Sequence, residues 1–217
     1  MDYILTPIEI RILGSLIEKE LATPDYYPLT LNSLTAACNQ KSSRDPVMNI
    51  DEQIVIRVLE DLRLKQLVWQ TTSMEGRVPK YKHNMKIFNF SPAETAILCV
   101  LFLRGPKTAG ELRIHTERLY KFNSIEEVEN NLNKLLEIEK GPYIIHLPRE
   151  SGHRERRYAH LFCGEVKVNL SQQEESQALE VKYENQKIEN LETEVNRIKK
   201  ELKDFKEQFE IFKKQFE

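Results

Sequence analysis

Two stretches decide the fold of this chain: Thr6-Pro7-Ile8-Glu9 and Ser91-Pro92-Ala93-Glu94. Each places a hydroxyl side chain at the N-cap of a helix, a proline at the first helical position and a glutamate at the third, which is a capping box. An apolar stripe with helical spacing follows each box. The offset is 85 residues throughout, so the sequence predicts two equivalent helices within an internal repeat.

Two more helices follow in each copy. Leu29-Thr30 leads into the second helix of the first copy, and Thr108-Ala109-Gly110-Glu111 is another capping box. The third helices are predicted to begin with caps at Asn49-Ile50-Asp51-Glu52 and Ser124-Ile125-Glu126-Glu127, an offset of 75 residues. Their apolar stripes match best at an offset of 73, so the two registers disagree by two residues.

A hairpin pattern closes each copy. β-forming residues flank Met74-Glu75-Gly76 in the first copy and Glu150-Ser151-Gly152 in the second, and both return strands carry Tyr-x-His. Three helices and a two-stranded hairpin form the winged-helix pattern. We therefore expect a mainly α fold with small β-hairpins (α+β), built from tandem winged helix-turn-helix domains over residues 1–85 and 86–165.

The first helix of the second copy is apolar on nearly every side. Ala96, Val100 and Leu103 stand where the first copy has Arg11, Ser15 and Glu18. A helix that is apolar all round is buried all round. We expect it to pack against the other winged unit or against another subunit.

The last part of the chain carries heptads. After a linker at 166–180, residues 181–217 repeat apolar positions with alternating spacings of three and four, as in a coiled coil. The alternative is one amphipathic helix that folds back onto the winged domains. The residues expected to form the dimerisation seam are Val181, Ile188, Leu191, Val195, Ile198, Leu202, Phe205, Phe209 and Phe212.

Composition limits the classes of function. The net charge of −2 argues against general coating of nucleic acid, although local basic patches remain open. The chain has no apolar run of membrane-spanning length, and its first residues lack the basic and apolar regions of a signal peptide. Its three widely spaced cysteines suit a reducing compartment. We expect a cytoplasmic protein with no membrane partner.

DNA is the partner that a winged helix most often contacts, with its third helix and its wing. The polar connection that starts at Asn39 offers groups for base edges and phosphates; the alternative is a solvated loop in which Asp45-Pro46 fixes a turn. In the second copy Glu126, Glu127 and Glu129 would be repelled by phosphate, so that copy is predicted to bind through its arginine wing or to dock protein. The candidate DNA-binding residues are Asn39, Gln40, Lys41, Ser43, Arg44, Arg57, Arg77, Lys80, Lys82, Arg154, Arg156 and Arg157.

Catalytic chemistry has little support in the sequence. His146, His153 and His160 are spaced by seven residues near Cys163, but a strand-turn-strand does not bring them together as zinc ligands. The chain has no glycine-rich phosphate loop and no local triad of nucleophile, base and acid. We expect no enzyme activity, no cofactor and no metal.

A resemblance to a known family rests on four motifs. The run Cys38–Asn49 resembles the signature of the YceH-like family of bacterial proteins, and Arg104-Gly105, Gly110-Glu111-Leu112-Arg113 and the run 156–161 match it further. The resemblance covers about residues 3–165. It implies tandem winged-helix domains in a cytoplasmic bacterial protein, and it implies no established activity.

Two hypotheses for function follow from these observations. The first is a dimeric DNA-binding protein that acts as a transcriptional regulator. The alternative is a protein-interaction adaptor that uses its winged helices as docking modules and binds no DNA. The acidic third helix of the second copy and the aromatic face of the tail favour the adaptor.

Overall fold

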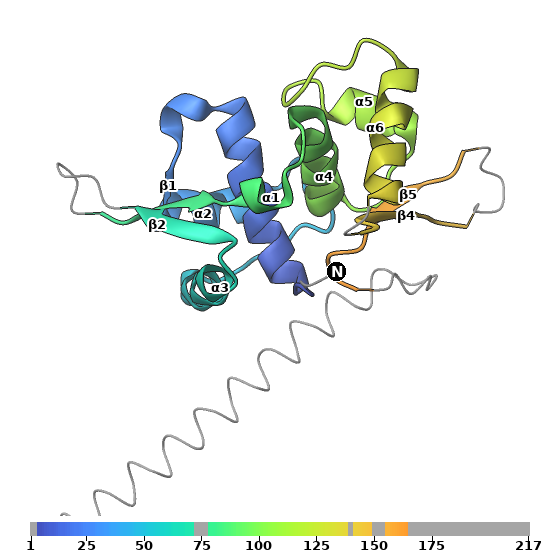
Figure 1. Ribbon diagram of the computed structural model, residues 1–217. Coiled ribbons are helices and arrows are strands. Elements are labelled where there is room, and N and C mark those ends of the chain that lie inside the picture. Colours follow the sequence, from blue (N-terminus) through green and yellow to red (C-terminus); the bar gives the residue numbers. More distant parts are fainter. Residues whose placement is uncertain (1–3, 72–77, 139–140, 149–154, 165–217) are drawn as a thin grey trace, which may run out of the picture. The chain divides into compact units, whose positions relative to one another are not determined.

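The computed structural model describes residues 4–71, 78–138, 141–148 and 155–164. The chain divides into two units, residues 1–168 and 169–217, and every described residue lies in the first. The fold of this first unit is α+β, with helices and small antiparallel sheets (Figure 1). The domain boundary predicted after residue 85 falls inside this one compact unit. The predicted linker and heptad helix, with all nine seam residues, lie outside the described residues.

The first repeat combines helices with a three-stranded sheet. Its elements are α1 (Pro7–Ala22), η1 (Pro24–Tyr26), β1 (Leu29–Thr30), α2 (Leu31–Cys38), α3 (Glu52–Leu64), β2 (Val68–Thr71), β3 (Lys80–His83) and η2 (Met85–Phe88). The strand order is β1-β3-β2, and both pairings are antiparallel. The predicted hairpin is confirmed as β2 and β3, but β3 is also paired with β1, a strand that the sequence pattern did not reveal.

The second repeat has the same order of elements. They are α4 (Pro92–Arg104), α5 (Ala109–His115), α6 (Ile125–Glu137), β4 (Ile144–His146) and β5 (Tyr158–His160). β4 and β5 form an antiparallel pair, and a single antiparallel bridge joins Lys107 to Tyr158. Lys107 lies between α4 and α5, at the position in the second repeat that β1 occupies between α1 and α2 in the first.

Local capping explains where the helices begin. The three predicted capping boxes are confirmed, with reciprocal bonds between Thr6 and Glu9 in α1 and equivalent pairs in α4 and α5. The cap predicted at Asn49 is wrong, because Asp51 caps α3 by accepting a bond from the Gln53 N–H at 2.7 Å. Since Ser124 caps α6, the caps also differ by 73 residues, and the disagreement with the apolar stripes disappears.

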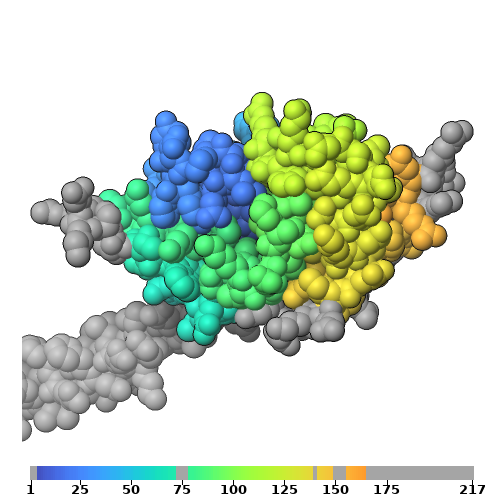
Figure 2. All heavy atoms as spheres, turned by 45° about the horizontal axis from the view of Figure 1, so that its top comes forward, coloured from blue at the N-terminus to red at the C-terminus, as the bar shows by residue number. Residues whose placement is uncertain are grey.

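The two repeats share one core along α1 and α4. These helices lie side by side (Figure 1), and α4 is buried on every side, from Ala96 through Leu103. At Gly14 the backbone of α1 passes so close to α4 that an added Cβ would lie 2.9 Å from Leu103. The thiol of Cys99 donates to the Gly14 carbonyl at 3.5 Å. The prediction that this apolar helix packs against the other repeat is confirmed, and Figure 2 shows the atoms of the two repeats in contact.

The segment between the repeats belongs to the same core. Phe88 and Phe90 stack on each other at 5.4 Å, and Phe90 meets Tyr143 edge-on at 4.9 Å. Phe88 also meets Phe162, which follows β5, at 5.5 Å. Aromatic contacts of this geometry add to the free energy of burial, so the connecting segment joins the repeats firmly. In the described ranges, none of the helices has the length and apolar character needed to cross a bilayer.

Candidate functional site

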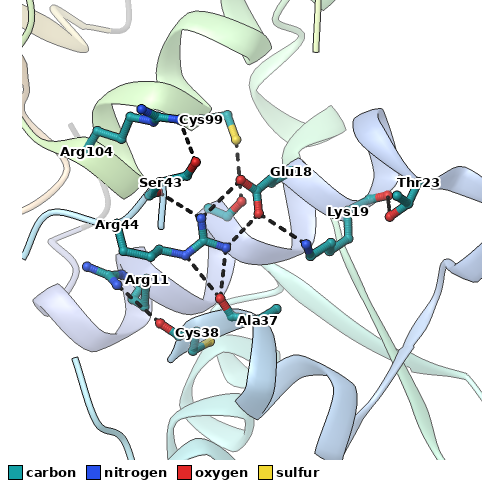
Figure 3. A network of polar contacts seen from close by, with 11 residues as sticks. Arg11, Glu18, Lys19, Thr23, Ala37, Cys38, Ser43, Arg44, Cys99 and Arg104 are labelled. Atoms are coloured by element: carbon teal, nitrogen blue, oxygen red, sulfur yellow. Dashed lines mark hydrogen bonds and ion pairs between the residues drawn. The ribbon is translucent and has the colours of Figure 1, made fainter. Parts of the chain in front are cut away.

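The connection between α2 and α3 is built around Arg44. This side chain is 6% exposed. Its Nε and Nη2 donate to the carbonyl of Ala37 at 3.1 and 2.8 Å, and its Nη1 and Nη2 donate to the two carboxylate oxygens of Glu18 at 3.0 and 2.6 Å (Figure 3). A bidentate pair of this kind fixes both distance and orientation. Arg44 thus ties the connection to α1.

The same connection also binds the second repeat. Arg104, at the end of α4, donates from Nη2 to the hydroxyl of Ser43 at 2.6 Å (Figure 3). The N–H of Asp45 donates to the carbonyl of Leu103 at 2.8 Å. We call Glu18, Ser43, Arg44 and Arg104 the inter-repeat clamp, because together they link α1, the connection and α4.

Arg11 adds a second buried guanidinium next to the clamp. It is 1% exposed and donates to the carbonyls of Cys38 and Pro46. Burial, together with the positive charge of Arg44, lowers the pKa of Arg11 to about 10. Two cations therefore lie close together inside the protein, and Glu18 is the carboxylate that pairs with Arg44.

These contacts correct three of the DNA-binding assignments. Asn39 uses its whole amide on the backbone of Ile50, donating at 2.8 Å and accepting at 2.7 Å. Ser43 accepts from Arg104, and Arg44 is buried against Glu18. Arg44 is buried and Asn39 and Ser43 are half-buried, and the polar groups of all three are engaged by other atoms of the protein. The polar run typical of a DNA contact is here a structural connection.

Other residues of the predicted set remain at the surface. Lys41 and Arg57 are exposed, and Gln40 is half-buried. The outward side of α3 also carries the exposed carboxylates Glu60 and Asp61, and it ends at Leu64, which is 83% exposed. Of these α3 residues only Arg57 belongs to the predicted DNA-binding set, and its three neighbours do not. The helical spacing of 57, 60, 61 and 64 was the signal that could have found them.

The first hairpin presents a basic face with an aromatic ring. In the β2–β3 register Trp69 pairs with Lys82, and Thr71 pairs with Lys80. Directly paired residues, and residues two apart along a strand, point to the same side of a sheet. Trp69 is 52% exposed, and the Nζ of Lys82 lies 5.2 Å from the centroid of its ring. We call these four residues the outer hairpin face.

The opposite side of this hairpin anchors it to the helices. Val68 is buried. The N–H of His83 donates to the Tyr27 hydroxyl at 2.7 Å, and its Nε2 lies 2.6 Å from a carboxylate oxygen of Glu20 on α1. The hydrogen bond with His83 lowers the pKa of Glu20, and burial raises that of Tyr27. The outer hairpin face therefore rests on a fixed support.

The second hairpin has a different outer face. Its register pairs Ile145 with Ala159, at the positions that Trp69 and Lys82 occupy in the first. Ile145 is 40% exposed, whereas Ala159 is 4% exposed. Of the arginines predicted for the two wings, Arg156 is exposed and Arg157 is half-buried. Arg77 and Arg154 lie outside the described residues.

One of the three carboxylates at the start of α6, that of Glu127, is engaged by neighbouring residues and does not point freely into solvent. Glu127 folds back on the preceding turn and accepts from the N–H and the side-chain amide of Asn123 at 2.8 and 3.1 Å. The Tyr120 hydroxyl donates to the same carboxylate at 3.3 Å. Glu126 and Glu129 are exposed. Two of the three predicted charges would therefore meet an approaching phosphate.

A metal or catalytic centre finds no further support. Among the described residues, no three His, Cys, Asp or Glu side chains come together as metal ligands would. The ring of His160 packs edge-on against Phe102 at 5.0 Å, and its Nδ1 is buried without a hydrogen-bond partner in the described part of the chain. Burial lowers the pKa of His160 to about 4, so this half-buried ring is neutral near pH 7.

Comparison with known proteins identifies the family. The model described as "Protein of unknown function, DUF480" matches residues 5–153. A UPF0502 protein of Geobacter sulfurreducens is 49% identical over 199 residues, which cover 90% of each chain. A UPF0502 protein of Vibrio atlanticus is 45% identical over 204 residues, 92% of this chain and 94% of the relative. The chain belongs to this DUF480 family of bacterial proteins, in agreement with the resemblance that its motifs carry.

Proposed function

We propose that this member of the DUF480 family is a tandem winged-helix protein that binds DNA in the bacterial cytoplasm and acts as a regulator. The order of elements supports the winged-helix assignment, because each repeat runs helix, short strand or bridge, helix, helix and hairpin. In the first repeat the short strand also pairs with the return strand of the hairpin. The repeats are held in one fixed arrangement by the α1–α4 core and the inter-repeat clamp.

The outer hairpin face is the observation that carries the proposal. Lys80 and Lys82 supply positive charge for phosphates, and Thr71 adds a hydroxyl. Trp69 supplies an exposed aromatic surface, and the Lys82 ammonium lies over its ring. Basic groups interleaved with an aromatic ring are typical of nucleic-acid-binding surfaces.

The proposed binding mode is led by the hairpin and not by the third helix. Glu60 and Asp61 on the outward side of α3 would be repelled by phosphates and offset the charge of Arg57, so we do not expect α3 to lead the contact with DNA. Lys41 and Arg57 are exposed cations of the same repeat that add to the attraction. The second repeat supports the first through the clamp and contributes little binding of its own.

The heptad tail completes the proposal. If residues 181–217 pair as a coiled coil, a dimer carries two copies of the outer hairpin face. Two weak contacts on one DNA molecule then bind with higher avidity than either contact alone. A truncation at Ser171 is expected to give monomers by analytical sedimentation and to weaken binding.

A salt titration with a matched variant tests the proposal. Each phosphate that a lysine neutralises contributes about 0.9 to the slope of log K against log salt on duplex DNA, and about 0.7 on a single strand. The variant Lys80→Ala/Lys82→Ala is therefore expected to lower the slope by about 1.4 to 1.8. Arg156→Ala removes a cation from the second hairpin and is expected to leave the slope unchanged.

The failure of this proposal is easily recognised. Fluorescence anisotropy with labelled DNA at low salt, about 50 mM, favours electrostatic binding. If the full-length protein binds neither duplex nor single-stranded DNA there, DNA is not its partner.

A protein-docking function is the second candidate, and Leu64 favours it. This residue is 83% exposed at the end of α3, and the exposed carboxylates of Glu60 and Asp61 lie on the same side of the helix. An apolar anchor with acidic neighbours suits a protein with a basic rim better than it suits DNA. A photoreactive side chain placed at position 64 would crosslink a specific protein in cells if this function holds, and the Leu64→Asp variant would lose that partner.

A further inference from the structure

We propose that the outer hairpin face recognises unpaired bases, with Trp69 as a stacking platform and Lys80 and Lys82 on the phosphates. This inference rests on the proposed DNA-binding function and assigns its ligand, which is single-stranded DNA or the unpaired end of a duplex. The side chain on which it depends is that of Trp69. Trp69 keeps 52% of its surface exposed, although an indole is among the largest apolar groups a protein has to bury.

The register shows that this exposure is built into the sheet. Trp69 lies on β2, the edge strand of the β1-β3-β2 sheet, opposite Lys82 of the central strand. Its strand neighbours Val68 and Gln70 point to the other side, where the hairpin packs on the helices. Moving Trp69 to the buried side would require a register shift of one residue, which would expose Val68. The fold therefore holds the indole outward.

An intact duplex makes little use of such a ring. Its bases are stacked on one another, and the faces of the bases are covered, so a hairpin meets only phosphates, sugars and groove edges. The lysines suffice for the phosphates. A single strand offers the faces of its bases, and stacking of a base on an aromatic side chain tolerates any base sequence because every base has a π face.

The spacing of the face also suits an extended strand. The Thr71–Lys80 pair lies two residues along the sheet from the Trp69–Lys82 pair, which is about 7 Å. This is similar to the distance between successive phosphates of an extended single strand. A base stacked on Trp69 would take the place of the Lys82 ammonium over the ring, and its flanking phosphates would then lie near Lys82 and Lys80.

Within the described residues, the carboxylate of Glu20 lies close enough to Lys82 to interact with its charge, and it already has a partner. Glu20 pairs with His83 at 2.6 Å, on the side of the hairpin that faces the helices. The positive charges of Lys82 and Lys86 act on the same carboxylate. Because Glu20 is held by His83, the lysines on the outer side keep their charge available for phosphate.

The sequence provides its own reporter, because Trp69 is the only tryptophan of the 217 residues. Titration of the full-length protein with oligo-dT is expected to quench the tryptophan fluorescence, and to do so at lower concentration than a duplex of equal length. Labelled oligo-dT should bind Trp69→Ala about 10-fold more weakly than the wild type, or weaker still. Trp69→Phe, which keeps an aromatic face, should recover part of that loss. An oligo-rU arm separates RNA from DNA as the source of the unpaired bases.

Three results would overturn the inference, and they differ in what else they exclude. If the duplex binds as tightly as oligo-dT or more tightly, the inference fails while the proposed function survives. If neither nucleic acid binds, both fail together. Equal binding of oligo-dT by wild type and Trp69→Ala also overturns the inference, because it shows that the lysines act without the ring.

Discussion

The two hairpins share a fold and differ in what they present to solvent. At one pair of facing positions the first hairpin has Trp69 and Lys82, and the second has Ile145 and Ala159. Ala159 is 4% exposed, so the second hairpin presents no charged group at the position of Lys82. The two hairpins therefore share their pairing, whereas at these described positions the first presents an indole and an ammonium and the second presents two apolar side chains.

The connections between the second and third helices also differ between the repeats, in whether an arginine is buried or exposed. In the first repeat the connection buries Arg44 against Glu18, and in the second the equivalent turn carries the exposed Arg118. Arg44→Ala is expected to lower the free energy of unfolding by about 3–5 kcal/mol, because it leaves Glu18 without its partner and opens a space in the clamp. Arg118→Ala should change it by less than about 0.5 kcal/mol. Urea denaturation followed by circular dichroism measures both.

A small effect of Arg44→Ala would break this comparison. If the two variants were equally stable, the connection would be a solvated loop, and Arg44 would return to the DNA-binding set.

The two hairpin histidines give a comparison in pH. His83 pairs with Glu20, whereas the ring of His160 packs edge-on against Phe102 and its pKa is lowered to about 4. Between the ordinary pKa of about 6.5 and pH 4, the unfolded chain binds a proton at His160 that the folded protein does not bind. Stability is therefore lost as the pH falls through this window, by about 3 kcal/mol at its lower end.

The variant His160→Phe isolates this contribution, since a phenyl ring cannot be protonated. Its free energy of unfolding, measured by urea titration at a series of pH values, should fall less steeply than that of the wild type between pH 6.5 and about 4. Parallel curves for the two proteins would show that His160 is protonated in the folded state.

Two glycines sharpen the contrast between the shared core and the surface. A Cβ at Gly14 would meet Leu103 at 2.9 Å, whereas at Gly110 in α5 the nearest atoms lie 3.9 Å away. Gly14→Ala should destabilise the protein by about 1–3 kcal/mol, because it forces α1 and α4 apart. Gly110→Ala has room and should stabilise it by about 0.5–1 kcal/mol, since alanine favours the helix. Thermal unfolding of the two variants gives both signs, and stabilisation by Gly14→Ala would show that the repeats are not tightly packed.

Much of the fold could be predicted because its signals are local. A capping box needs only four residues, and all three of those predicted are present. β1 was not predicted because it has only two residues and is recognised only by its pairing with β3, some fifty residues later. The cap of α3 is harder to place from sequence because Asn49 and Asp51 both suit an N-cap, and only the structure shows that Asp51 is the one used.

The candidate site was harder to predict because its partners are distant in sequence. Arg44 looks like a phosphate contact until Glu18, on another helix, is placed beside it. The pairing of Trp69 with Lys82 depends on the hairpin register, and eight residues separate β2 from β3, so the turn did not fix it. The lysines could be identified as candidates from the sequence. Their position on the same side of the sheet as Trp69 became clear only from the register.

The most direct test gives the first hairpin the residues of the second. The double variant Trp69→Ile/Lys82→Ala changes half-exposed positions and should keep the fold, which circular dichroism can verify. Binding of labelled oligo-dT by this variant should be about 10- to 100-fold weaker than that of the wild type, because one stacking surface and one phosphate contact are lost. Ile145→Ala, the control in the second hairpin, should bind normally. If the exchanged hairpin binds as tightly as the original, the outer hairpin face is not the binding surface, and the central claim is contradicted.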